Sequence, residues 1–210
     1  NTGYNPFTAD GKKTAAYEIW EQVLRKLEPD SPPLTIYISV GDGNIISGVY
    51  KGFQDLLSLG WIERLPRLIG VQAEGSAAIA NAYLAGKDTV DPVNAVTIAD
   101  SISVDLPRDG RRALRAVRET HGMFIKISDE EILKSIATLG KVGIFVEPAA
   151  AAAYAGLART VAEGQQDPAA PILVLCTGSG LKDINAAMRS VPAAPVIEPT
   201  IQALTKVIYG

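Results

Sequence analysis

A glycine-rich turn between a strand-like and a helix-like segment is the first feature of this sequence that could bind a ligand. Residues 40–48 read Val-Gly-Asp-Gly-Asn-Ile-Ile-Ser-Gly. Glycines let backbone amides approach a ligand closely, and the start of a helix adds unpaired N–H groups and a positive dipole end. The turn therefore favours an anion such as phosphate, although a tight turn without a ligand has the same pattern. Ile46 stands where a dinucleotide fingerprint needs glycine, and Val49 where a Walker loop needs lysine.

A second turn of this kind follows the apolar run 172–176. It reads Thr177-Gly178-Ser179-Gly180-Leu181-Lys182-Asp183. Thr177 would place a hydroxyl at the end of a strand, where it can donate a hydrogen bond to an unprotonated ring nitrogen, as a carboxylate cannot. The alternative is that a hydroxyl in this turn caps the helix that begins near Leu181. The pattern leaves both interpretations open.

The remaining chemistry-bearing residues are few. One cysteine and one histidine exclude a zinc finger and a disulfide scaffold, and we expect no metal site. We expect Cys176 to be a small core residue of a buried strand, and His121 to lie near a helix end, where the dipole favours it. A solvated helix face is expected for five arginines. They are Arg108, Arg111, Arg112, Arg115 and Arg118.

Composition bounds the class of protein. The chain has 210 residues, 47% of them hydrophobic and 20% charged, which indicates one folded domain or part of a two-domain enzyme. A net charge of −3 gives no indication of a nucleic-acid partner. No run approaches the ~18 apolar residues of a membrane span. The first residues do not resemble a signal peptide, and with the single cysteine they indicate a reducing cytoplasm.

Strand-like and helix-like segments alternate along the chain. The expected strands are 34–40, 67–72, 123–127 and 172–176, and the expected helices are 12–27, 45–59, 76–85, 109–119, one that starts at a capping box on Ser128, and 149–162. We expect 89–107 to be a loop with one short strand, and the tail from Val191 to extend over the surface.

This alternation predicts an α/β fold: an open, mostly parallel sheet with helices on both faces. The run 172–176 is nearly all apolar, which is typical of a strand that is buried on both faces. In such sheets ligands bind outside the carboxyl ends of the strands, where both glycine-rich turns lie.

Five motifs occur in the order in which one enzyme family has them. They are Asn5-Pro6-Phe7 with Gly11-Lys12-Lys13-Thr14, Val40–Ile45 with Lys51-Gly52-Phe53, Arg64–Ala73, Gly143–Ala149 and Thr177–Asp183. With them the chain resembles the threonine synthase family, which are pyridoxal-phosphate enzymes of fold type II. The resemblance implies that residues 1–210 are the C-terminal part of the large cofactor-binding domain. It also implies that the N-terminal segment with the Schiff-base lysine, and the small domain, are absent.

The resemblance also implies roles for residues of this chain. Backbone amides of the first turn would hold the phosphate of pyridoxal 5'-phosphate; these residues are Gly41, Asp42, Gly43, Asn44 and Ile45. Thr177 would bind the pyridine nitrogen, and Glu74 and Glu147 would lie near the ring or the substrate. No catalytic residue is expected in this chain: Lys182 only superficially resembles a Schiff-base lysine, and Lys12 and Lys51 are expected to be solvated helix residues.

The function implied is conversion of O-phosphohomoserine and water to threonine and phosphate by the intact enzyme. Its partners would be an amino-acid substrate, the N-terminal portion of the same enzyme and a second copy in a homodimer; this chain alone would be inactive. Family members often carry an arginine shortly after the Asn-Pro pair that binds the substrate phosphate, whereas this chain has Thr8 there and no arginine before Arg25. Two alternatives stay open: another β/γ-eliminating or replacing enzyme, such as a threonine dehydratase-like lyase, and a non-catalytic remnant that binds phosphate or a partner.

Overall fold

A four-stranded parallel sheet forms the centre of the molecule. The computed structural model describes residues 4–209. The strands are β1 (Thr35–Ser39), β2 (Arg67–Ala73), β3 (Met123–Ile127) and β4 (Ile172–Leu175). They lie in the order β3-β2-β1-β4 and every pair is parallel. The predicted open α/β sheet is confirmed.

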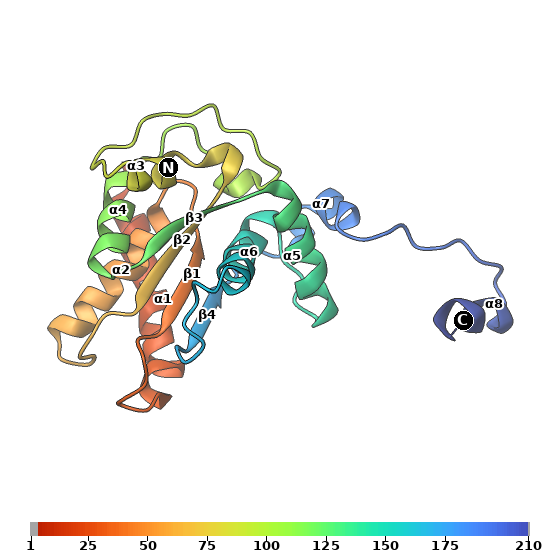
Figure 1. Cartoon of the computed structure of the whole chain (residues 1–210), viewed down its shortest axis with the longest axis horizontal. Helices are drawn as coiled ribbons and strands as arrows, with labels where there is room; N and C mark the ends of the chain where they lie inside the picture. Colours follow the sequence, from red (N-terminus) through yellow and green to blue (C-terminus); the bar gives the residue numbers. More distant parts are fainter. Residues whose placement is uncertain (1–3, 210) are drawn as a thin grey trace.

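Helices cover both faces of the sheet (Figure 1). One face carries α1 (Pro6–Gln22), α2 (Asn44–Ser58), α3 (Ala78–Leu84) and α4 (Gly110–Glu119), and the other α5 (Asp129–Lys141), α6 (Pro148–Ala162) and α7 (Ile184–Arg189). Short 3-10 turns η2, η3, η4 and η5 span Leu24–Lys26, Glu74–Ser76, Asp100–Ile102 and Gly180–Lys182. Each layer of helices buries its own apolar core against the sheet.

Strand β1 is buried on both faces because it lies inside the sheet with helices above and below. Ile36 and Ile38 pack into the core beneath α1 and α2, whereas Tyr37, between them, points into the core beneath α6. This alternation follows from the two-residue period of a strand. The Tyr37 hydroxyl is hydrogen-bonded to Thr160 at 2.7 Å, so its polar atom is satisfied inside the core.

Helices α1 and α2 approach each other at two glycines of α2. A Cβ atom at Gly48 would lie 2.6 Å from the carbonyl oxygen of Ala9, and one at Gly52 would lie 2.7 Å from the Cβ of Ala16. The two backbones are therefore nearly in contact. At the side of this contact Lys13 donates to Asp55 at 2.7 Å, and this hydrogen bond holds the pKa of the Asp55 carboxyl below its usual value.

Several local predictions are confirmed. The capping box is formed, because Ser128 accepts from the Glu131 amide at 3.2 Å while the Glu131 carboxylate accepts from the Ser128 amide at 2.7 Å. Helix α4 presents its arginines to solvent, and three of them pair with carboxylates. His121 lies two residues beyond α4, with a positive φ of 51°.

Other expectations are wrong at the margins of the sheet. Strand β4 is an edge strand, paired only with β1 among residues 4–209, so it is half-buried or exposed rather than buried on both faces. Cys176 is accordingly exposed and not a core residue. Residues 89–107 contain a 3-10 turn but no strand. Helix α1 begins at Pro6 and not at Lys12, because Asn5 caps it by accepting from the Phe7 amide.

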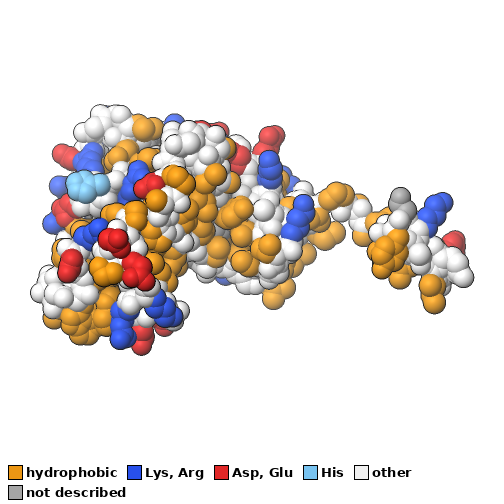
Figure 2. Space-filling view, turned by 60° about the horizontal axis from the view of Figure 1, so that its bottom comes forward, with side chains coloured by type: hydrophobic (Ala, Val, Ile, Leu, Met, Phe, Trp, Pro, Cys, Tyr) orange, Lys and Arg blue, Asp and Glu red, His pale blue; other side chains and the backbone are white. Residues whose placement is uncertain are grey.

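The C-terminal tail differs from its prediction too. Instead of lying over the surface, the chain beyond α7 leaves the body and ends in a separate helix, α8 (Ile201–Tyr209) (Figures 1 and 2). None of its residues is buried, and Ile201, Val207 and Ile208 are exposed. None of the helices in the described part of the chain is long and apolar enough to cross a membrane.

The glycine contact between α1 and α2 yields a stability prediction. We expect Gly48→Ala to lower the free energy of unfolding by about 1–3 kcal/mol, because the new methyl group meets backbone that must shift. The control is Gly140→Ala in α5, where a Cβ would meet nothing within 4 Å. That variant should raise stability by about 0.5–1 kcal/mol. Urea unfolding followed by circular dichroism measures both, and equal effects would contradict the packing described here.

Candidate functional site

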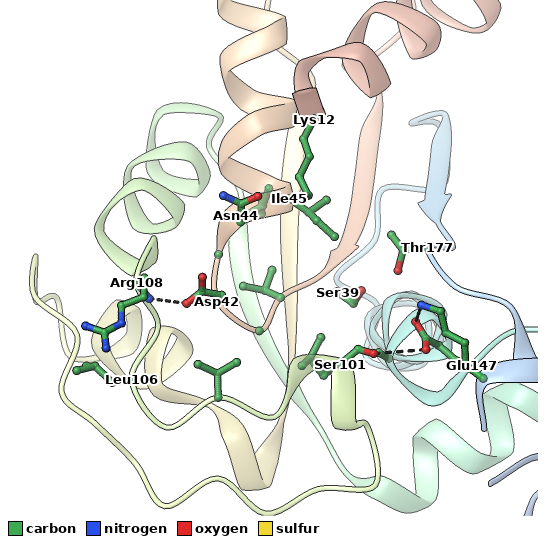
Figure 3. Close-up of a pocket in the computed structure, with 18 of the residues that line it drawn as sticks. Lys12, Ser39, Asp42, Asn44, Ile45, Ser101, Leu106, Arg108, Glu147 and Thr177 are labelled. Carbon is green, nitrogen blue, oxygen red and sulfur yellow. Dashed lines mark hydrogen bonds and ion pairs between the residues drawn. The ribbon is translucent and has the colours of Figure 1, made fainter. Parts of the chain in front are cut away.

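A cavity of about 540 Å³ opens at the carboxyl end of β1 (Figure 3). Its walls come from the loop after β1, the start of α2, the turn η4, the segment before α4 and the loop after β4. The cavity brings together the first turn, residues 41–45, with Thr177 and Glu147. The two glycine-rich turns, far apart in sequence, therefore meet because β1 and β4 are parallel neighbours whose carboxyl ends share one edge.

The start of α2 offers unpaired backbone donors to this cavity. Gly43 precedes the helix with a φ of 89°, and no side chain of residues 4–209 caps the helix. Within residues 4–209 the N–H groups of Gly43, Asn44 and Ile45 donate to no protein acceptor. Only glycine adopts this φ without strain, and a Cβ at Gly43 would lie 2.9 Å from the carbonyl oxygen of Asp109. A helix start with free amides is suited to hold an anion.

Residues just before α4 hold the turn in place. The amide of Arg108 donates to the Asp42 carboxylate at 2.6 Å, and the amide of Asp109 donates to the Asp42 carbonyl at 3.0 Å. The side chain of Asp109, only 4% exposed, accepts from the Asn44 amide group at 2.8 Å. The loop is thus fixed by both backbone and side-chain bonds before any ligand arrives.

Asn44 has an unsatisfied atom at the cavity. It is 5% exposed, and its Oδ1 is buried with no hydrogen-bond partner in the described structure. An unpaired buried acceptor costs about 1–3 kcal/mol, which offsets part of the stabilisation from the hydrogen bond between Asn44 and Asp109.

Thr177 stands opposite, in a loop that is tied to the start of α6. Val146 and Ser179 form an isolated antiparallel bridge, and the Glu147 amide donates to the Gly178 carbonyl at 3.1 Å. The Thr177 side chain is labelled in Figure 3 beside the cavity. Its hydroxyl makes no hydrogen bond to any other described residue, so it is free to donate to a ligand.

Glu147 is the buried carboxylate of the site, with 6% of its surface exposed. Ser101 lies 3.4 Å from its Oε2, and Lys182 lies 3.3 Å from its Oε1. The structure thus gives Lys182 a carboxylate partner. Next to Thr177, partial burial raises the pKa of the Cys176 thiol although the residue is exposed, so the thiol is protonated at neutral pH.

Glu74 is not brought to the cavity. It begins the 3-10 turn after β2, and its carboxylate lies 3.6 Å from Arg159. Because Arg159 also pairs with Glu131, Glu74 belongs to a surface ion cluster. Among residues 4–209 no group of three His, Cys, Asp or Glu residues is placed to hold a metal ion.

Sequence reasoning missed several residues that line the cavity, among them Lys12, Ser39, Ser101 and Arg108. Lys12 was expected to be a solvated helix residue, as Lys51 is, where it pairs with Asp10 on the outer surface. The available signal was the pair of glycines four residues apart on α2. They bring α1 against the start of α2 and so carry Lys12 to the cavity.

Comparison with known proteins defines the class of protein. Residues 1–178 match the model of the family described as "Pyridoxal-phosphate dependent enzyme". The chain belongs to this family of pyridoxal-phosphate enzymes.

The curated proteins that the chain resembles include threonine synthases. The chain is 35% identical to the threonine synthase of Methanocaldococcus jannaschii over 206 residues, which are 97% of this chain and 50% of that protein. It therefore spans about half the length of the curated relatives it matches.

Solved structures share the fold. The L-serine ammonia-lyase of Rhizomucor miehei aligns with a TM-score of 0.64 at 24% identity, over 81% of this chain and 51% of that one. The Escherichia coli threonine synthase aligns with a TM-score of 0.62 at 18% identity, over 87% and 42%. At these identities the likeness shows the fold, that of fold type II pyridoxal-phosphate enzymes.

The bonds that hold the first turn give a second prediction. We expect Asp109→Ala to lower the free energy of unfolding by about 1–3 kcal/mol, because it leaves the buried Asn44 amide group unpaired. Asp109→Asn keeps an acceptor oxygen on a side chain of the same length, so it should lower the free energy of unfolding by less than Asp109→Ala does. Urea unfolding of both variants checks this, and an equal loss in the two would mean that the Asn44 hydrogen bond is not the cause.

Proposed function

We propose that this cavity holds pyridoxal 5'-phosphate, with the phosphate on the amides at residues 41–45 and the pyridine nitrogen on Thr177. One observation carries the proposal: free N–H groups at an uncapped helix start and a free hydroxyl face the same cavity. The residues fit the group. The amides match an oxyanion, and a hydroxyl matches a neutral aromatic nitrogen.

The cofactor supplies the chemistry that side chains lack, by drawing electrons from bonds at the α carbon of an amino acid. The residues of this chain place it and control protonation at one atom. Thr177 donates a hydrogen bond without giving up a proton, so the ring nitrogen stays neutral. Glu147, held by Lys182 and Ser101, fixes the loop that carries Thr177. Under this proposal Glu74 has no contact with the ring.

We further propose that the chain forms the C-terminal part of the large domain of a threonine synthase. In that enzyme, O-phosphohomoserine and water give threonine and phosphate. Two observations support this: the half-length match to threonine synthases, and the outer edge of β4, which no strand of the described residues pairs and where another part of the domain would add strands. The Schiff-base lysine then comes from an N-terminal portion, so this chain alone is inactive. The intact enzyme is a homodimer of the cytoplasm, where a single free cysteine stays reduced.

A second candidate is a lyase that acts on threonine or serine. It is favoured by the absence of an arginine near Thr8 and by the structural likeness to an L-serine ammonia-lyase. A third candidate is a non-catalytic remnant that binds phosphate or a partner. An activity assay distinguishes it from the two enzymes.

The proposed activity gives a direct test. The full-length protein that contains this chain, loaded with pyridoxal phosphate, should release phosphate from O-phosphohomoserine and form threonine in equal amounts. Release of a 2-oxo acid from threonine or serine, without the synthase reaction, would favour the lyase. Binding of the cofactor with neither reaction would favour the remnant, and the chain 1–210 alone should give no turnover.

The cradle of amides gives a test of cofactor binding. We expect Gly43→Val to reduce retention of pyridoxal phosphate by tenfold or more (about 1.4 kcal/mol), because the side chain strains the φ of 89° and meets Asp109. Gly60→Val is the control, since Gly60 also has a positive φ, of 70°, but has open space around it and lies outside the cavity. Cofactor absorbance after gel filtration is the measurement. Loss of the cofactor in both variants, or in neither, would contradict the assignment.

A further inference from the structure

Lys12 is a cation in the cavity that the roles described so far do not use. Figure 3 shows its side chain reaching from α1 toward Ile45 at the start of α2. In the part of the chain that the structure describes, its ammonium has no hydrogen bond and no ion pair. Its neighbours on the same pair of helices are paired: Lys13 with Asp55 and Lys51 with Asp10. Lys12 alone among these three lysines turns into the cavity.

The backbone fixes where the Lys12 side chain begins. A Cβ at Gly48 would lie 2.6 Å from the Cβ of Lys12, so the base of the lysine side chain rests directly on α2. The residue is half-buried there and lines the cavity. The packing of α1 on α2 therefore sets the starting point of the side chain, and its flexible four-carbon stem brings the ammonium to the cavity.

Of the four other charged side chains at the cavity, two form an ion pair, one accepts a backbone hydrogen bond and one contacts an aromatic ring. Lys182 and Glu147 neutralise each other at 3.3 Å, and Asp42 accepts from the Arg108 amide. The guanidinium of Arg108 lies 5.3 Å from the centre of the Tyr4 ring. If the helix-start amides hold the cofactor phosphate, as proposed above, the charge of Lys12 is available for a second anion. In the proposed reaction the other anion that enters this site is the substrate.

We propose that Lys12 determines substrate specificity by binding a phosphate group at the end of the substrate side chain. The inference rests on the proposed function, because it assumes that the cofactor occupies the amides. A lysine ammonium is a compact point charge that recurs as a phosphate ligand, and a phosphate carries more negative charge than a carboxylate.

The test uses the full-length holoenzyme and unreactive ligands of equal length. These are 2-amino-5-phosphonopentanoate, the carboxylate 2-aminoadipate and the uncharged 2-aminohexanoate, each titrated by the change in cofactor absorbance. In Lys12→Met, which keeps the packing on Gly48, the phosphonate should bind about tenfold to a hundredfold more weakly, as for loss of one hydrogen bond to a charged group. The uncharged ligand and cofactor retention should not change. Lys12→Arg should keep most of the phosphonate affinity.

Lys51→Met is the matched control, because it removes the same charge from the outer surface and should leave all three ligands unaffected. Unchanged phosphonate binding in Lys12→Met would overturn this inference and leave the proposed function intact. Loss of the cofactor in that variant also overturns it, since Lys12 would then serve the cofactor phosphate. A Lys12-dependent preference for 2-aminoadipate would contradict the choice of phosphate. A wild-type protein that retains no pyridoxal phosphate would instead overturn the proposed function, before any Lys12 variant is compared.

Discussion

The start of α2 has no cap of its own, and the rest of the site is arranged around that fact. A helix that begins at a cavity carries free N–H groups there, and these groups need an acceptor. Here Gly43 leaves the space open, and the segment at residues 108–109 holds the turn in the shape that keeps it open. The loop is rigid before it binds, so little ordering is required of it when an anion arrives.

The second constraint is the order of the strands. Because β1 pairs with β4, the loops after these two strands lie at one edge although about 130 residues separate them. The bridge between Val146 and Ser179 then ties the second loop to the start of α6. Anion cradle, hydroxyl and buried carboxylate thus come from three separate stretches of chain, each held by its own backbone bonds.

Most of the fold follows from local patterns. The strands, the helices that cover them and the capping box at Ser128 have clear signals in residue type and period. The glycine-rich turns pointed to the correct edge, since parallel strands place such turns together. The prediction that β4 is buried on both faces is wrong, because an apolar run shows only that a strand is suited to burial and not which strands lie beside it. The prediction that Cys176 is a core residue is wrong for the same reason.

The remaining differences depend on contacts between distant segments. Lys12 looks like any lysine on an amphipathic helix, and only the approach of α1 to Gly48 turns it toward the cavity. Glu74 and Glu147 both lie at the ends of regular elements, so the sequence does not distinguish them. In the structure Glu74 lies near Arg159 in a surface ion cluster, away from the cavity. Helix α8 has a clear helical pattern at residues 201–209, but prolines just before it suggested an extended tail throughout.

The contact of α1 with Gly48 and Gly52 is made by backbone and Cβ atoms, which have no alternative rotamers to adopt. The distance between the base of the Lys12 side chain and the start of α2 is therefore fixed by packing, while its four-carbon stem can still adjust. A site built this way has a fixed anchor and an adjustable reach. It selects the charge of its guest more strictly than the length of its guest.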